Sequence, residues 1–252
     1  MVAKTLGEQK RIVAVLDQAF AALDRARAHA EANLMDADDL FVRQRETLTS
    51  RNKKTWVAMT IGDVCERFEY GTSTKSLPEG RVPVLRMGNL QQGELDWSNL
   101  VYTDDSEDIQ KLALHSDDVL FNRTNSAEHV GKTAIFRGER EAIFAGYLIR
   151  LHMRKNIINP EYLNIFLNSN RARDYGRTVM GKSVNQANIS ASKLRTYPID
   201  VPPLAEQEAI VENLLRVREQ TGKLKKAIEV KLSDLANLRQ SLLQKAFSGQ
   251  LK

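Results

Sequence analysis

LAEQEAIVENL, residues 204–214, organises this chain, because a second version of it, LGEQKRIVAVL, stands at residues 6–16. Leu, Glu, Gln, Ile, Val and Leu recur at matching positions of the two copies, 198 residues apart. An internal repeat constrains the architecture more than any single motif does, since both copies are expected to form the same structure. The remaining sequence is therefore interpreted around these two segments.

Each copy opens a long stretch in which apolar or small residues recur in steps of four and three. The first series is Ile12, Leu16, Ala19, Leu23, Ala26, Ala30, Asn33, Ala37 and Leu40, and the second is Ile210, Leu214, Val217, Thr221, Leu224, Ile228, Lys231, Leu235, Leu238 and Leu242. Such spacing, sustained over about four to five heptads, is typical of a coiled-coil seam. The pattern predicts two long helices, residues 1–50 and 204–252, that pair as an antiparallel coiled coil.

Residues 51–203 have a different pattern, in which short apolar segments alternate with Gly, Pro, Asn and Asp clusters. The expected strands lie within residues 56–61, 82–86, 119–122, 132–136 and 142–151. One amphipathic helix is expected from Pro160 to about Tyr175, with Tyr162, Leu163, Phe166 and Leu167 on its inner face. The fold class is therefore α+β: one mixed α/β globular domain flanked by two long helices.

The composition argues against several classes of protein. Cys65 is the only cysteine, which excludes a disulfide framework and a cysteine-based zinc site, and fits a reducing cytoplasm. We find no signal-peptide core and no apolar run of the roughly 18 residues that would span a membrane. The four histidines are dispersed, and no arrangement of nucleophile, base or metal ligands is recognisable, so we expect a non-catalytic chain.

Charge is unevenly distributed around a net value of +5. Residues 94–118 carry eight acidic residues and one lysine, whereas residues 119–200 carry thirteen Lys or Arg and six acidic residues. A basic flank of this kind suits a polyanionic partner such as double-stranded DNA, although scattered surface charge is the plainer explanation.

GRTVMGKS, residues 176–183, matches the phosphate-binding pattern G-x-x-x-x-G-K-[ST]. That pattern acts on a nucleotide only between a strand and a helix. Here a predicted helix precedes Gly176 and a polar stretch follows Ser183, so we expect a DNA-contacting loop, with an ordinary solvated loop as the alternative. The candidate residues of this loop are Arg177, Lys182, Ser183, Asn185 and Gln186.

Three further polar segments are candidates for DNA contact, because amide and guanidinium groups read base edges while lysines and hydroxyls contact phosphates. Their residues are Thr72, Ser73, Thr74 and Lys75; Arg86 and Asn89; and Arg123, Thr124, Asn125, Ser126 and Lys132. Each segment could also be an ordinary turn, since Asn, Gly and Ser favour turns for backbone reasons. Within them, Arg123 is the candidate reader of a guanine and Asn125 of an adenine.

The repeated L-x-EQ-x-x-IV helices and LRQSLLQKAFSGQL (238–251) resemble the conserved regions of type I restriction-modification specificity (HsdS) subunits. DDVLFNRTNSAEHVGKTAIF (117–136) and AIFAGYLIRL (142–151) resemble their target recognition domain. This resemblance implies a DNA-recognition subunit that is not itself catalytic. It also implies adenine methyltransferase (M) subunits and a motor-nuclease (R) subunit as partners, with S-adenosylmethionine, ATP and Mg²⁺ bound by those partners.

A full specificity subunit has two recognition domains, whereas this sequence resembles a C-terminal half with one. We expect it to read half of a bipartite site, as a homodimer or beside another half-subunit. The alternative is a coiled-coil scaffold or antagonist that binds methyltransferase subunits without reading DNA.

Overall fold

The computed structural model describes residues 5–50, 55–182 and 186–250. The chain folds into two compact units, one comprising residues 1–43 and 214–252 and the other residues 44–213. Two long helices, α1 (Leu6–Thr49) and α7 (Leu204–Phe247), make up the first unit and continue into the second.

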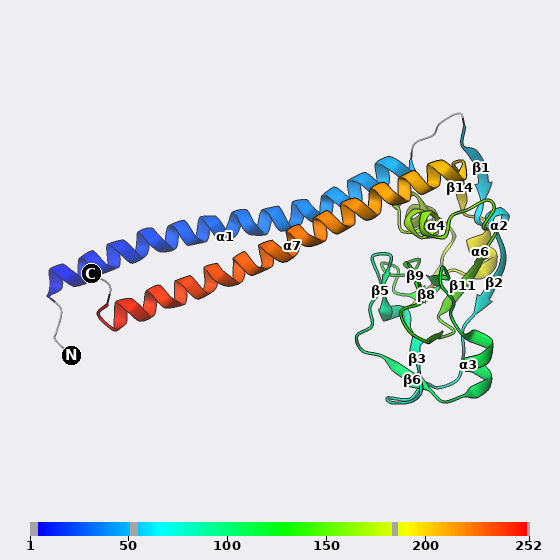
Figure 1. The fold of residues 1–252 in the computed structure, drawn as a ribbon, viewed down its shortest axis with the longest axis horizontal. Coiled ribbons are helices and arrows are strands. Elements are labelled where there is room, and N and C mark those ends of the chain that lie inside the picture. Colours follow the sequence, from blue (N-terminus) through cyan, green and yellow to red (C-terminus); the bar gives the residue numbers. More distant parts are fainter. Residues whose placement is uncertain (1–4, 51–54, 183–185, 251–252) are drawn as a thin grey trace. The chain divides into compact units, whose positions relative to one another are not determined.

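The two helices of the first unit lie side by side and run in opposite directions (Figure 1). Asp24 accepts a hydrogen bond from Arg239 at 2.6 Å, and Asp38 pairs with Lys225. From Asp24 to Asp38 the residue number in α1 rises, while that of the partner in α7 falls from Arg239 to Lys225. The pairing is therefore antiparallel, and the predicted coiled coil is confirmed. Ala30 and Ala37 are buried in the seam, where their small side chains allow close approach.

The seam departs from the predicted series at Asn33, Leu40, Leu224, Lys231 and Leu238, which are all exposed. Phe41 is half-buried in place of Leu40, and the guanidinium of Arg218 lies 4.8 Å from the centre of its ring. A straight α-helix drifts against a strict seven-residue repeat. The spacing therefore identifies the helices correctly while misplacing some of the residues that face the partner.

The second unit is a mixed α/β domain built from several small sheets. Its shorter helices are α2 (Ile61–Val64), a 3₁₀ turn (Met87–Asn89), α3 (Ser106–Leu112), α4 (Pro160–Leu167), α5 (Asn170–Val179) and α6 (Ala191–Arg195). Its strands are β1 (Val57–Thr60), β2 (Cys65–Tyr70), β3 (Val82–Leu85), β4 (Leu90–Gln91), β5 (Glu94–Leu95), β6 (Val101–Thr103), β7 (Val119–Asn122), β8 (Thr124–Asn125), β9 (Thr133–Ile135), β10 (Ile143–Phe144), β11 (Leu148–Met153), β12 (Gly181–Lys182), β13 (Ala187–Asn188) and β14 (Pro198–Val201).

The central sheet is antiparallel, with strand order β2-β11-β7-β9. A second sheet, in the order β10-β3-β6, shares a core with it that includes Leu85, Leu120, Phe136 and Phe144. Strands β1 and β14 pair antiparallel, so the chain enters and leaves the domain at adjacent strands (Figure 1).

Two predicted elements are each divided in the structure. The single helix expected from Pro160 to Tyr175 was a wrong prediction, because α4 ends at Leu167 and α5 begins at Asn170. Ser169 caps α5 by accepting a hydrogen bond from the amide of Ala172, which makes a new helix start favourable. The expected inward residues of α4 are nonetheless buried.

The apolar run 142–151 forms two strands in different sheets rather than one. Strand β10 pairs parallel with β3, whereas β11 joins the central sheet after Gly146 and Tyr147. The segment after β2 passes close to the end of β10, and Gly71 is required there. An added Cβ at Gly71 would lie 2.2 Å from the carbonyl oxygen of Phe144.

A buried guanidinium connects β11 with β2 and with the start of β7. Arg150 of β11 is cross-strand from Glu69 of β2 and donates to its carboxylate at 2.5 and 2.9 Å. It also donates to Asp118 at 3.0 Å and to the carbonyl oxygen of Ala113 at 2.6 Å. Burial alone would raise the pKa of Glu69, but hydrogen bonds from Arg150 and His152 lower the pKa below its ordinary value. A buried charge is tolerated only with such partners.

We predict that Glu69→Gln lowers the free energy of unfolding by about 3 kcal/mol at pH 7, because it leaves Arg150 buried with only part of its compensation. A carboxylate whose folded pKa is depressed contributes its stability above its unfolded pKa and loses it as pH falls through the folded value. The difference from the parent should therefore be constant from pH 7 to about 5 and shrink below about pH 4.5. Denaturant unfolding across this range measures it.

Glu66→Gln is the matched control, because Glu66 is an exposed carboxylate of the same strand. It should change stability by less than about 0.5 kcal/mol. Equal losses in the two variants would contradict the assigned role of the Arg150 network.

Candidate nucleic-acid interface

A small three-stranded sheet joins two candidate segments that lie far apart in the sequence. Its order is β12-β13-β8, so the segment around Arg123 pairs with the segment around Lys182. Asn125 is opposite Ala187 and Thr124 is opposite Asn188, while Gly181 is opposite Asn188 from the other side. The side-chain amide of Asn188 also donates to the hydroxyl of Thr124 at 2.7 Å. The two segments are therefore one surface.

Arg123 lies at the centre of this surface, between the central sheet and the small one. Its amide donates to the carbonyl oxygen of Tyr147 at 3.0 Å, and its carbonyl oxygen accepts from the amide of Ile189 at 2.9 Å. Its guanidinium carbon lies 5.0 Å from the centre of the Tyr70 ring. Tyr70 and Tyr147 are 43% and 49% exposed, so aromatic surface is available close to the arginine.

Sequence reasoning missed both tyrosines. A search for polar loop residues passes over an aromatic residue at a strand end, although interleaved aromatic and basic residues are a usual feature of nucleic-acid surfaces. Tyr70 is the last residue of β2 and Tyr147 immediately precedes β11. Each tyrosine adjoins a glycine, Tyr70 in the sequence YGT (70–72) and Tyr147 in the sequence AGY (145–147). This position beside a turn is the sequence feature that could have identified them.

The segment 72–75 divides into a structural and an exposed part. Thr72 is buried, donates to Asp108 and accepts from the amide of Thr74 at 2.9 Å. Ser73, Thr74 and Lys75 are exposed. The hydroxyl of Thr72 thus fixes the turn, and only the next three side chains are presented to solvent.

Arg86 and Asn89 likewise have different environments. Asn89 is buried, and its side-chain nitrogen donates to the carbonyl oxygens of Asp96 and Ser98 at 2.9 and 3.1 Å. Its side chain therefore holds the 96–99 loop and has no free amide hydrogen for a base. Arg86 is exposed and donates to the carbonyl oxygen of Asn99 at 2.8 Å.

The remaining candidates are placed as follows. Ser126 is exposed, and its amide donates to the side-chain oxygen of Asn125 at 2.8 Å, while Thr124 is buried. Lys132 donates to Gln91 at 3.2 Å, and burial together with nearby Arg173 lowers the pKa of its ammonium group. Gln186 is exposed. Ser183, Asn185 and the side chain of Lys182 lie outside the described residues.

Arg177 lies on a helix and not on the predicted loop. It is part of α5, where it pairs with Asp174 at 2.6 Å, and Gly176 is also helical. No strand leads into this glycine, as expected, and Lys182 belongs to β12 rather than to a helix start. The cavity beside Gly176 measures only about 50 Å³, whereas ligand pockets are usually several hundred Å³. The geometry is unlike that of a nucleotide-binding loop.

Among the described residues we find neither a metal-binding cluster, nor a reactive thiol, nor a helix that could span a membrane. In the part of the chain that the structure describes, no three His, Cys, Asp or Glu side chains gather as a metal site would require. Burial raises the pKa of Cys65 to about 12, so its thiol is not a nucleophile at neutral pH. None of the described helices is both long and apolar enough to cross a bilayer.

A model of the protein family described as "Type I restriction modification DNA specificity domain" matches residues 53–234. The chain belongs to this family. The matched specificity domain includes the whole candidate surface and the first part of α7.

Curated relatives of this specificity domain agree with the assignment. The chain is 30% identical over 197 residues to a protein of Methanocaldococcus jannaschii assigned as the MjaX type I restriction enzyme specificity subunit, covering 77% of this chain and 45% of that protein. It is 26% identical over 262 residues to the EcoKI specificity subunit of Escherichia coli K12, covering 98% of this chain and 56% of that subunit. The chain thus spans about half the length of these relatives.

Solved structures share the fold of the specificity domain and its helices. The HsdS subunit from Thermoanaerobacter tengcongensis superposes with a TM-score of 0.63 at 22% identity, covering 98% of this chain and 59% of that one. A structure described as showing complex assembly and conformational transition of the type I R-M system gives a TM-score of 0.77 at 21% identity, covering 97% and 60% of the two chains. The predicted fold class is confirmed.

Gly176 provides a test of the structural interpretation of the GRTVMGKS segment. An added Cβ would lie 2.6 Å from the hydroxyl oxygen of Tyr197, so Gly176→Ala should lower the free energy of unfolding by about 1–2 kcal/mol despite the better helix propensity of alanine. That hydroxyl is buried without a hydrogen-bond partner among the described residues. In a Tyr197→Phe background the same change should therefore no longer destabilise. Thermal unfolding of the four proteins measures this sign change, and equal losses in both backgrounds would contradict the packing described.

Proposed function

We propose that this chain forms a DNA-recognition part of a type I restriction-modification system, reading one half of a bipartite site. The observation that carries the proposal is the family match over residues 53–234, which spans the surface around Arg123. The relatives are named as specificity subunits of type I restriction enzymes, and the proposal extends that role to this chain.

The chemistry of the surface supports DNA as the ligand. An arginine fork suits the two acceptors of a guanine in the major groove, and exposed amides and hydroxyls suit adenine edges and phosphates. Arg123, Asn125 and Gln186 belong to the β12-β13-β8 region or adjoin it. Burial and the charge of Arg173 lower the pKa of Lys132, and a phosphate beside Lys132 would stabilise its charged form.

Catalysis belongs to partner subunits in this proposal. Adenine methyltransferase subunits would bind S-adenosylmethionine, and a motor-nuclease subunit would bind ATP and Mg²⁺. This chain would dock methyltransferase subunits through its antiparallel helices and pair with a second half, either another copy or a different half-subunit. The proposed location is the cytoplasm, where the genome is accessible.

The function is tested by co-expressing the chain with its methyltransferase subunits in a methylation-free host and sequencing the methylome. We expect methylated adenines within one specific bipartite motif, whose two half-sites form an inverted repeat when two copies of this chain pair. If the complex assembles but methylates no specific sequence, and binds all DNA duplexes equally, the chain is a scaffold or antagonist and the proposal fails.

Within this function, Arg123→Ala should relax specificity at one base position and leave the others unchanged, because a bidentate contact contributes about 1–3 kcal/mol of discrimination. Competition binding between the cognate duplex and single-mismatch duplexes measures the effect.

Arg140→Ala is the matched control, since Arg140 also lies over an aromatic ring, 4.9 Å from the centre of Trp97, but outside the candidate surface. It should leave every position unchanged. An unchanged motif in Arg123→Ala would assign the readout to another residue.

A further inference from the structure

We propose that Tyr70 is a positioning residue for base recognition, whose ring holds the guanidinium of Arg123 in its reading orientation. The inference rests on the proposed function. It concerns an aromatic side chain at the end of β2, whereas Arg123 follows the last residue of β7.

Tyr70 contacts both neighbours with different parts of its side chain. Its ring lies 5.0 Å from the guanidinium carbon of Arg123. Its hydroxyl oxygen accepts a hydrogen bond from the amide of Ala191 at 3.1 Å, at the first residue of α6. The ring therefore supports the cation while the hydroxyl fixes the segment that follows β13.

The main chain of Arg123 is already held on both sides by its hydrogen bonds to Tyr147 and Ile189. The remaining freedom is in its side chain. The guanidinium makes one long contact, from Nη1 to the carbonyl oxygen of Gly146 at 3.4 Å, and its Nε is buried without a hydrogen-bond partner among the described residues. The ring of Tyr70 is thus the principal contact that orients this group.

Comparison with other arginines of the same unit explains why an aromatic ring suits the orientation of a base-reading guanidinium better than a carboxylate does. Arg150 and Arg137 both pair with glutamates within 3.0 Å, which occupy their N–H groups. No ion pair between residues described in the structure involves Arg123. An aromatic face attracts a guanidinium without taking up the N–H donors that would read a base. The guanidinium of Arg123 is consequently oriented without a carboxylate partner among the residues that the structure describes.

The role predicts a specific pattern of variants. Tyr70→Leu should reduce discrimination by about 2- to 5-fold at the position read by Arg123, the amount expected for loss of a partly exposed cation–π contact, and at no other position. Tyr70→Phe keeps the ring and should retain full discrimination. Tyr70→Leu combined with Arg123→Ala should be no worse than Arg123→Ala alone, because both changes remove the same readout.

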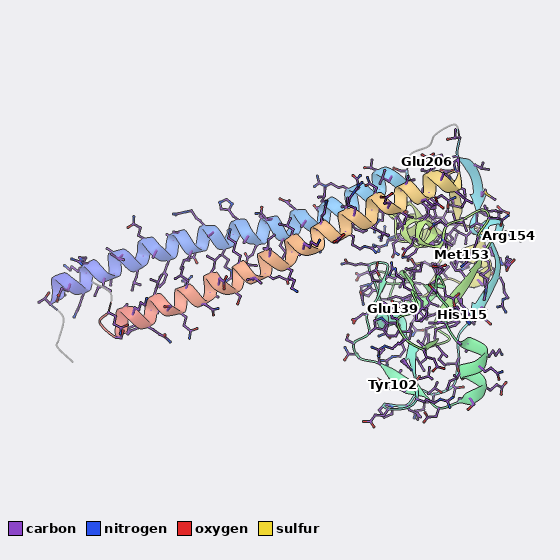
Figure 2. All side chains as sticks on the ribbon, viewed as in Figure 1. Tyr102, His115, Glu139, Met153, Arg154 and Glu206 are labelled. Atoms are coloured by element: carbon purple, nitrogen blue, oxygen red, sulfur yellow. The ribbon has the colours of Figure 1, made fainter. Side chains whose placement is uncertain are left out.

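The experiment uses the full chain in complex with its methyltransferase subunits, with competition binding against single-mismatch duplexes and thermal unfolding of each variant. Tyr102→Leu is the matched control. Tyr102 is a half-buried tyrosine on β6, which belongs to the β10-β3-β6 sheet and not to the sheet that contains Tyr70, and Figure 2 shows it at the lower end of the unit in this view. It should leave discrimination unchanged.

The outcomes separate the inference from the proposed function. If Arg123→Ala changes no position, Arg123 is not a base reader and both its proposed role and that of Tyr70 fail. If Arg123→Ala relaxes one position but Tyr70→Leu leaves it intact, weakens all sequences uniformly or relaxes a different position, the positioning role is overturned while the proposed function stands. Loss of discrimination in Tyr70→Phe would also overturn it, and this variant preserves the packing of the ring if Tyr70→Leu does not fold.

Discussion

The need to compensate one buried cation determines the arrangement of the α/β unit, residues 44–213. Arg150 lies on β11, between β2 and β7, and is bonded to Glu69 and Asp118 on either side. A guanidinium in this position requires its carboxylates in fixed places, since the cost of an unpaired buried charge is several kcal/mol. The register of three strands is therefore fixed by charge as well as by backbone pairing.

That register has a direct effect on the candidate surface. Strand β2 ends at Tyr70, β7 ends one residue before Arg123, and β11 begins one residue after Tyr147. These ends meet at the same edge of the sheet, because β11 is antiparallel to both neighbours. A rigid, charge-compensated sheet thus presents three side chains from three separate segments at one place, which is the usual way in which a scaffold positions binding residues.

The sequence predicted the two helices, the domain between them and the apolar segments that form β1, β3, β7, β9, β10 and β11, because seams and apolar runs are local patterns. It failed where a property depends on distant residues. The burial of Asn89 depends on carbonyl oxygens in a later loop. Likewise, the pairing of β8 with β13 could not be inferred from either segment alone, so the candidate residues were identified as separate loops rather than as one surface. The division between α4 and α5, by contrast, depends on a local cap at Ser169 that the sequence interpretation overlooked.

The strands β8, β12 and β13 contribute only two residues each to their sheet, and this brevity has an evolutionary consequence. Main-chain hydrogen bonds maintain such pairing and place few demands on the identity of the outward side chains. In the proposed function, mutations there would alter which bases are preferred without disturbing the Arg150 network that maintains the sheet. A chain with this function would therefore acquire new target preferences by single substitutions on an unchanged framework.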